Sequence, residues 1–221
     1  MKILKITFVY NNEGNPGFMT GWGFSCLVEY SGSKILFDTG CDGPELIFNM
    51  KKLGLDPKEI DTVVLSHQHL DHIGGLFTLL CLNKTLRVFV LSSFSSKIKE
   101  HIKKNAECIE IKEGQEICKN IFTTGLIKGN PDEQSLLVKT KKGIVVLTGC
   151  SHPGVDRILG IAEHYGKVFA IIGGLHGFND FNILKNIPLI GACHCTQYKQ
   201  EIKEKFPNSF REIRAGDIIQ C

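Results

Sequence analysis

The most informative stretch of this chain is Ser66-His67-Gln68-His69-Leu70-Asp71-His72-Ile73-Gly74-Gly75. It follows an apolar run at residues 62–65, which predicts a strand, and precedes residues 76–82, which predict a helix. A strand-to-helix loop of this kind can aim several side chains into one cleft. Packing of three imidazoles and a carboxylate in a core would be costly without a partner. We therefore expect the cluster to bind metal.

The spacing within the cluster indicates how the metal would be held. His67 and His69 alternate along the chain, so they can face one ion together, whereas Asp71 and His72 lie beyond the turn and suit a second ion. Imidazole and carboxylate donors fit Zn²⁺, and Fe²⁺ or Mn²⁺ are also allowed. One or two ions are expected. A metal pair can hold hydroxide at neutral pH and polarise a carbonyl or phosphoryl oxygen.

Bulk properties exclude several classes of function. The formal net charge of +3 is small and the lysines are dispersed, which argues against nucleic acid and leaves a small-molecule substrate, an anionic one included. No apolar run approaches the roughly 20 residues that span a bilayer, so no membrane association is expected. The start alternates like a strand and does not resemble a signal peptide. Nine cysteines, an odd number, indicate a reducing, cytoplasmic location. Oligomeric state is not predicted.

Hydrophobic patterning predicts alternating strands and helices. Strands are expected at residues 2–10, 24–30, 33–38, 61–66, 86–91, 107–111, 116–118, 121–126, 135–140, 143–147, 167–172, 189–192, 210–213 and 217–219. Helices are expected at residues 43–54, from 73, at 93–104 with Ser92 or Ser93 as cap, at 153–165, at 181–186, and from a Thr196 cap to 205. No linker interrupts the chain, so a single domain over residues 1–221 and a layered α/β sandwich are predicted.

Three further histidines each follow an apolar, strand-like run that contains glycine: His152, His176 and His194. A lone histidine in such a place is usually structural. Three of them in one kind of location, on the same chain as the cluster, indicate the second half of a site. If parallel strands end on one side of the sandwich, these histidines converge where ligands bind in such sheets. His101 and His164 fall on predicted helices beside Lys or Glu and are expected at the surface.

Several polar residues have both a structural and a functional explanation. Cys150, Cys193 and Cys195 could be thiolate ligands, but buried free thiols are more common, and an extended chain would turn the last two away from His194. Asp38 ends a strand and could accept a hydrogen bond from a ligand histidine. Glu133 lies in a polar loop at residues 130–134 and could reach a cleft.

Taken together, His67-x-His69-x-Asp71-His72 after an apolar strand, with Asp38-Thr39-Gly40 upstream, resembles the metallo-β-lactamase superfamily. Residues 148–152, 173–176 and 194–196 are similar to a subgroup that contains archaeal dihydropterin–ribofuranosyl-aminobenzene phosphate synthases and uncharacterised bacterial relatives. The resemblance spans most of the chain. It implies an α/β fold, the αβ/βα four-layer sandwich of the metallo-β-lactamase type, with a one- or two-metal site at the sheet edges.

The resemblance also implies roles for individual residues. His67, His69, Asp71 and His72 match the first ligand group, and His194 matches the last ligand histidine. Many members have a ligand histidine where residues 124–127 of this chain have none. His152 is expected to supply that imidazole, with Cys150 as the rival. His176 is open between a ligand, a proton donor and a substrate contact.

Three functions follow as expectations. The first is a hydrolase-like enzyme whose metal-bound water or hydroxide attacks an ester, lactone, phosphoester or diphosphate, with Asp71 or His176 handling protons. The second is a pterin-type transferase in which the metal stabilises departing diphosphate. The third is a metal- or pterin-binding protein without catalysis, or an iron site for redox work. The name of the superfamily does not establish a β-lactam substrate, because a fold does not specify its substrate.

Overall fold

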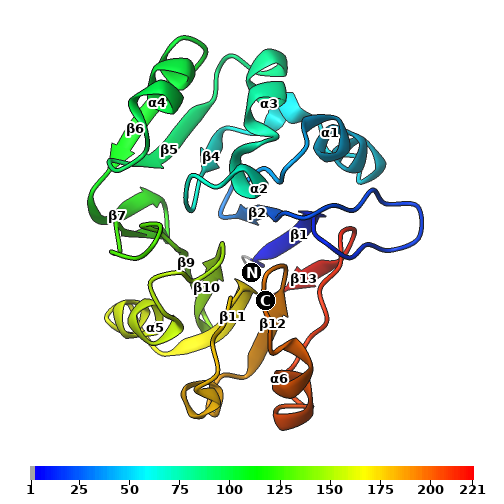
Figure 1. Ribbon diagram of the computed structural model, residues 1–221, viewed down its shortest axis with the longest axis vertical. Helices are drawn as coiled ribbons and strands as arrows, with labels where there is room; N and C mark the ends of the chain where they lie inside the picture. Colours follow the sequence, from blue (N-terminus) through cyan, green and yellow to red (C-terminus); the bar gives the residue numbers. More distant parts are fainter. Residues whose placement is uncertain (1–2) are drawn as a thin grey trace. The chain divides into compact units, whose positions relative to one another are not determined.

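The computed structural model describes residues 3–221 and separates into two compact units. Unit 1 comprises residues 3–112 and 214–221, and unit 2 comprises Glu113–Ile213. Each unit contains one β-sheet with its own helices (Figure 1). The assignment of residues 1–221 to a single domain remains a prediction.

The sheet of unit 1 is mixed. Its strand order is β13-β1-β2-β3-β4-β5-β6. The strands are β1 (Lys5–Tyr10), β2 (Ser25–Tyr30), β3 (Ser33–Phe37), β4 (Thr62–Val64), β5 (Arg87–Leu91), β6 (Glu107–Ile111) and β13 (Ile218–Gln220). Strands β3 to β6 are parallel, and Phe37 pairs with Val64. Asp38 and the histidine cluster therefore leave the same edge of the sheet.

The helices of unit 1 follow the expected order, with two corrections. They are α1 (Gly43–Lys52), the 3₁₀ turn η1 (Pro57–Glu59), α2 (Leu70–Ile73), α3 (Leu76–Leu82) and α4 (Ser96–Lys103). The helix predicted at residues 76–82 is α3, but the predicted start near Ile73 is wrong, because Ile73 is the last residue of α2, which begins at Leu70 and places Asp71 and His72 on a helical turn. The cap of α4 is Ser95 rather than Ser92 or Ser93, since its Oγ accepts from the N–H of Ile98.

The glycines of the cluster explain the break between α2 and α3. A Cβ at Gly74 would lie 1.9 Å from the carbonyl oxygen of Cys41, and one at Gly75 would lie 2.2 Å from that of Thr39. Real Cβ atoms do not approach backbone so closely, so only glycine lets this turn press against the loop after β3. The two glycines at the end of the motif thus allow α2 to pack against the loop after β3.

The sheet of unit 2 has the order β12-β11-β10-β9-β8-β7. The strands are β7 (Glu113–Cys118), β8 (Ile121–Gly125), β9 (Leu136–Thr140), β10 (Gly143–Thr148), β11 (Val168–Gly174) and β12 (Leu189–Cys193). Strands β7 to β10 are antiparallel, and β10, β11 and β12 are parallel. Thr148 pairs with Gly173, and Gly174 pairs with Cys193, so the loops that carry the three later histidines begin at one sheet edge.

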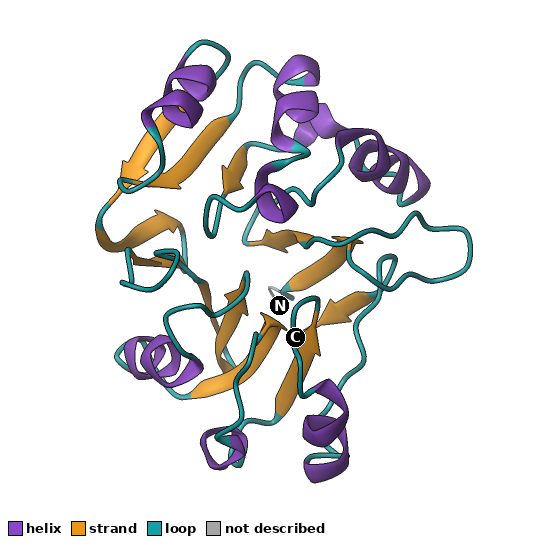
Figure 2. Cartoon of the chain, in the orientation of Figure 1, coloured by secondary structure: helices purple, strands orange, loops and turns teal. Residues whose placement is uncertain are grey.

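The helices of unit 2 cover one face of this sheet (Figure 2). They are α5 (Val155–Glu163), the 3₁₀ turn η2 (Phe181–Leu184) and α6 (Lys199–Lys205). Ile158 of α5, Leu184 of η2 and Ile202 of α6 belong to one buried cluster with strand residues. That shared cluster explains why the three segments lie on the same side.

Two expectations in the C-terminal part are wrong. Thr196 does not cap α6, whose first helical residue is Lys199. Its hydroxyl instead donates to the carbonyl of Cys193 and accepts from the N–H of Leu175. These two bonds connect the loops that follow β11 and β12. Residues 210–213 form no strand, and only Phe210 makes an isolated bridge, to Ile190.

The α/β class is as expected. All nine cysteines are free thiols, in agreement with a chain that does not depend on a disulfide framework. Four of them are buried, whereas the sequence predicted that most of the nine would be. Among residues 3–221, no helix has the length and apolar character needed to cross a bilayer.

Candidate functional site

The histidine cluster of unit 1 is gathered as the sequence predicts. The ring centroid of His67 lies 4.2 Å from that of His72 and 4.7 Å from that of His69. His67 and His72 are fully buried, whereas His69 is exposed. Asp71 Oδ2 lies 3.6 Å from His72 Nε2. The three imidazoles and the carboxylate therefore form one compact donor set that is open to solvent on the His69 side.

Asp38 holds this donor set through hydrogen bonds to Ser66 and His72. Its carboxylate is fully buried and accepts from the N–H of Ser66 on Oδ1 at 2.7 Å. On Oδ2 it accepts from the Ser66 hydroxyl and from His72 Nδ1, both at 2.7 Å. The predicted hydrogen bond to Asp38 from a histidine of the cluster is therefore present, and that histidine is His72.

These hydrogen bonds determine which ring nitrogen carries the proton. A carboxylate only accepts, so His72 must hold its proton on Nδ1. The Ser66 hydroxyl gives its single proton to Asp38, so at its 2.9 Å contact with His67 Nδ1 it accepts, and His67 is also protonated on Nδ1. In their neutral form both rings consequently present the lone pair of Nε2. That is the donor a metal ion requires, so these residues fit a divalent cation.

The backbone of α2 is held by two neighbouring loops. Thr39 donates its N–H at 2.8 Å and its hydroxyl at 2.9 Å to the carbonyl of His72. Phe24 donates its N–H to the carbonyl of Asp71 at 3.2 Å. Helix α2 has only four residues, so these outside bonds replace the stability that a longer helix would supply.

A buried tyrosine supports the loop after β3. The ring of Tyr10 lies against Gly40, where an added Cβ would come within 2.5 Å of the ring and where φ is +67°. The Tyr10 hydroxyl donates to Glu45 Oε2 at 2.5 Å. Burial and then this hydrogen bond raise the pKa of Tyr10 above its ordinary value near 10.

Tyr10 makes stability fall at high pH. Because its pKa is raised in the folded state, its contribution is fully present below the ordinary value of 10.0 and is lost as the pH rises beyond it. One proton corresponds to a slope of about −1.4 kcal/mol per pH unit. Urea unfolding between pH 9 and 12 should show a slope that approaches this value above pH 10 in the wild type, and a flatter dependence in Tyr10→Phe. Identical slopes in the two proteins would contradict the assignment.

The later histidines lie at the end of the parallel strands of unit 2. His152 follows β10, His176 follows β11 and His194 follows β12. The rings of His152 and His176 lie 5.0 Å apart. The N–H of Gln197 donates to the carbonyl of His176 at 2.9 Å, which joins the loops after β11 and β12. Within unit 2, the predicted convergence of these histidines at one sheet edge is therefore present.

Residues at these strand ends adopt left-handed backbone. The φ angles are 57° at Asp38, 64° at Ser151, 43° at His176 and 50° at His194. Such a conformation costs an L-residue other than glycine roughly 1–2 kcal/mol. Strain of this kind persists where the surrounding structure imposes it and is typical of functional sites. The outliers thus support the same residues that the sequence selected.

A second buried carboxylate holds the loop after β10. Glu133 is fully buried, and its Oε1 accepts from the N–H groups of Gly149, Cys150 and Ser151 at 3.1, 2.8 and 2.9 Å. Its Oε2 accepts from the N–H and from Nδ1 of His152, at 3.0 and 2.9 Å. The polar loop at residues 130–134 is therefore not merely an exposed turn, because its Glu133 carboxylate holds the loop after β10 at the sheet edge.

Two of these contributions were not apparent from the sequence. Ser66 was not selected, although a hydroxyl directly before a candidate ligand histidine is a usable signal. Glu133 was expected as a loop residue that could reach a cleft, but its role in holding the loop after β10 was missed, because carboxylates are seldom fully buried and no local pattern marks the exception. Cys150 is 3% exposed and is the rival of His152 still to be tested.

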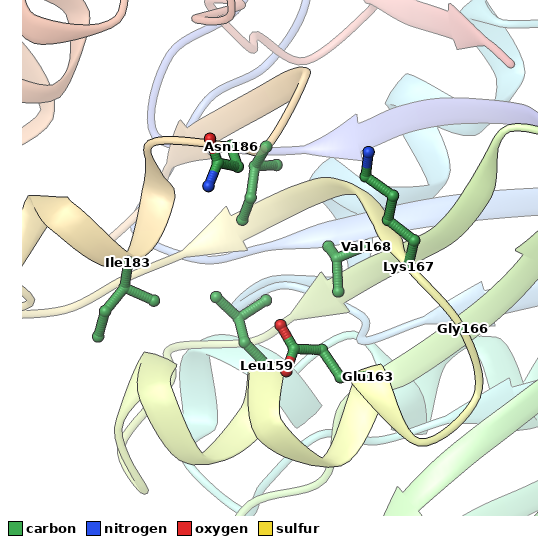
Figure 3. A pocket seen from close by; sticks show the side chains of 8 residues that line it. Leu159, Glu163, Gly166, Lys167, Val168, Ile183 and Asn186 are labelled. Atoms are coloured by element: carbon green, nitrogen blue, oxygen red, sulfur yellow. The ribbon is translucent and has the colours of Figure 1, made fainter.

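The hollow in Figure 3 is a separate feature of unit 2. Apolar side chains of Leu159, Val168 and Ile183 line it, with Glu163 and Lys167 also at its wall. It lies at the start of β11, whereas His176 follows the end of that strand, about 20 Å further along. Its lining contains no histidine or cysteine, so it is not the metal candidate.

Comparison with known proteins places the chain in a family. The sequence signature of the metallo-beta-lactamase superfamily matches residues 23–81, which include Asp38 and the whole histidine cluster. A solved structure described as a metal-dependent hydrolase of the β-lactamase superfamily is 30% identical, covers 99% of both chains and superposes with a TM-score of 0.82. The chain belongs to the metallo-β-lactamase superfamily.

Members of the metallo-β-lactamase superfamily are mostly metal-dependent hydrolases. The chain is also 29% identical to the 7,8-dihydropterin-6-methyl-4-(β-D-ribofuranosyl)-aminobenzene-5′-phosphate synthase of Methanocaldococcus jannaschii, over 100% of this chain and 96% of that protein. A diphosphatase from the PhnP family matches at 17% identity with a TM-score of 0.67, which supports the fold alone. The fold type suggested by the motifs is therefore confirmed, and the chain is similar over its full length to a member of the suggested subgroup.

Proposed function

We propose that this protein is a metal-dependent enzyme of hydrolase type. The observation that carries the proposal is the donor set of unit 1, in which hydrogen bonds to Asp38 and Ser66 leave Nε2 of His67 and His72 as electron-pair donors. A purely structural cluster would have no use for three adjacent imidazoles with this arrangement of protons. Membership of a superfamily made up mostly of metal-dependent hydrolases supports the same conclusion.

The proposed ligands are His67, His69, Asp71, His72, His152 and His194. They would hold one or two Zn²⁺ ions, with Fe²⁺ or Mn²⁺ as alternatives. When bound, such an ion lowers the pKa of water and polarises a carbonyl or phosphoryl oxygen. The chain itself orients the imidazoles of His67 and His72 through Asp38 and Ser66.

The proposed substrate is a small ester, lactone, phosphoester or diphosphate. Asp71, whose side chain is 17% exposed, and the exposed His176 are the groups proposed to move protons during the reaction. Neither side chain is fully enclosed, so both are able to meet a substrate.

Chelation tests this function directly. The purified protein, loaded with Zn²⁺, Mn²⁺ or Fe²⁺, is assayed against nitrophenyl phosphates, a nitrophenyl ester and an acyl lactone. We expect one substrate class to be turned over, activity to be abolished by a chelator, and activity to return on adding metal. His67→Ala is expected to lose bound metal by elemental analysis.

A matched control is available on a helix of the other unit. His164 is exposed at the end of α5, so His164→Ala should keep full metal content and activity. Full metal content in a His67/His69 double alanine variant would contradict the proposed ligands. Metal binding without turnover in any assay would favour a binding protein instead.

A second candidate is a transferase. The observation that favours it is the full-length similarity to a protein named as a dihydropterin–aminobenzene phosphate synthase. In this case the protein would join a dihydropterin diphosphate to a ribofuranosyl-aminobenzene phosphate and release diphosphate. Incubating both substrates together, and each alone, decides between the candidates, because only a transferase requires both for diphosphate release.

A further inference from the structure

The buried carboxylate of Glu133 and the loop at residues 149–152 form a closed hydrogen-bonding unit. Four consecutive backbone N–H groups and one ring nitrogen point at its two oxygens, at distances between 2.8 and 3.1 Å. Successive N–H groups that converge in this way form an anion-binding nest, and here a side chain of the same protein occupies it. All five donors belong to unit 2.

Burying the carboxylate of Glu133 costs free energy unless hydrogen bonds replace its contacts with water. Removing a carboxylate from water costs several kcal/mol, which the five hydrogen bonds offset only when all of them are made. Three of them occupy Oε1, so the two on Oε2, both from His152, complete the set. The side chain of His152 is 8% exposed, so water has little access to compete for this contact.

The contact fixes the protonation of the ring. An ionised carboxylate has no proton to give, so His152 Nδ1 must carry a proton, and in the neutral ring the lone pair is then on Nε2. The left-handed backbone of Ser151, with φ of 64°, and its hydroxyl bond to the carbonyl of Gly174 at 2.7 Å hold the turn that positions this ring.

We propose that Glu133 is a positioning residue that locks His152 in its Nδ1–H form and so presents Nε2 as an electron-pair donor. The inference rests on the proposed function in one respect, namely that a metal ion is what Nε2 would bind. It also has a consequence for the reaction. The four N–H groups of residues 149–152 are bonded to Glu133, so they do not serve as an oxyanion hole.

A buried carboxylate that fixes the proton on Nδ1 of a histidine therefore occurs twice in the chain, with different residues. In unit 1 an aspartate acts on His72 directly and on His67 through a serine hydroxyl. In unit 2 a glutamate from the loop between β8 and β9 acts on His152 directly. In both units the imidazole is protonated on Nδ1, although the carboxylate belongs to an aspartate in unit 1 and to a glutamate in unit 2.

Nuclear magnetic resonance can read this form without any activity measurement. Full-length protein labelled with ¹⁵N in its eight histidines is recorded at a pH where imidazoles are neutral, before and after loading with Zn²⁺. His152→Ala identifies the His152 signals. We expect the wild type to show His152 protonated on Nδ1 in both samples.

Glu133→Gln should reverse the tautomer. With the amide oxygen retained at the N–H groups of residues 149–151, the amide nitrogen takes the place of Oε2. It no longer accepts from the N–H of His152 but donates to Nδ1, so the ring proton moves to Nε2. Zn²⁺ affinity, measured by competition with a chromophoric chelator, should then fall about 10- to 100-fold. The matched control is Glu116→Gln, since Glu116 also accepts a backbone N–H, from Asn120, but contacts no histidine in the bonds described.

The outcomes separate the two proposals. His152 protonated on Nε2 in the wild type would overturn the positioning role, whether or not the variant folds. So would a folded Glu133→Gln protein, judged by its amide spectrum, that retains the wild-type tautomer. A reversed tautomer with unchanged Zn²⁺ affinity would support the positioning role and instead remove His152 from the proposed ligands.

Discussion

Asp38→Ala is expected to lower the free energy of unfolding by about 3–5 kcal/mol, because it leaves buried donors without an acceptor. The N–H of Ser66 and Nδ1 of His72 both lose their partner, and Asp38, Ser66 and His72 are all fully buried. Alanine also tolerates the left-handed backbone at this position, where φ is 57°, less well than aspartate. Chemical denaturation of the metal-free protein measures the change.

Asp38→Asn separates orientation from stability. Asparagine keeps the shape and the left-handed backbone, so it should cost less stability than alanine. Its amide nitrogen would face His72 Nδ1 and favour the tautomer protonated on Nε2, which removes a metal donor. Metal affinity should therefore fall about 10- to 100-fold in this variant. A loss of less than 1 kcal/mol in Asp38→Ala would show that the buried hydrogen bonds do not support the fold as described.

Metal loading is expected to produce the second large effect. A ligand that binds only the folded state stabilises it by about 2.7 kcal/mol at 100 times its dissociation constant and about 4.1 kcal/mol at 1,000 times. We expect Zn²⁺ to raise the free energy of unfolding of the wild type by such an amount. His69→Ala should remove most of this gain, because it deletes one proposed ligand.

His69 is the best ligand for this test because it is exposed. Exposed substitutions usually change stability by less than about 0.5 kcal/mol, so the metal-free variant should match the metal-free wild type. His67→Ala would be less clear, since that ring is fully buried and its loss also leaves a cavity. His164→Ala should retain the full response to Zn²⁺. An equal response in His69→Ala would exclude His69 as a ligand.

Local signals were sufficient for much of the candidate site. The cluster from His67 to His72 has a spacing that only metal chemistry explains well, and its strand and glycines are contiguous in the sequence. The three later histidines were found because each follows an apolar run, and β10, β11 and β12 are indeed parallel neighbours. Asp38 could be proposed as the partner of a histidine because it ends a predicted strand, and the structure adds that this strand, β3, pairs with β4.

Other features depend on contacts that are remote in sequence. The start of α2 at Leu70 reflects bonds from Thr39 and Phe24 to its backbone, which no local propensity contains. Thr196 looks like a helix cap, but its hydroxyl is used between Leu175 and Cys193. In each case a tertiary hydrogen bond outweighs a local preference of about 1 kcal/mol.

The sequence by itself determined the α/β class, the family and the identity of the metal-ligand candidates, because these depend on periodicity and on the spacing of a few residue types. Only the tertiary structure decided the protonation of the imidazoles. Asp38 lies 34 positions from His72, and Glu133 lies 19 positions from His152. A buried carboxylate fixes a histidine tautomer only through direct contact, and that contact exists only after the strands have paired and brought the two loops together.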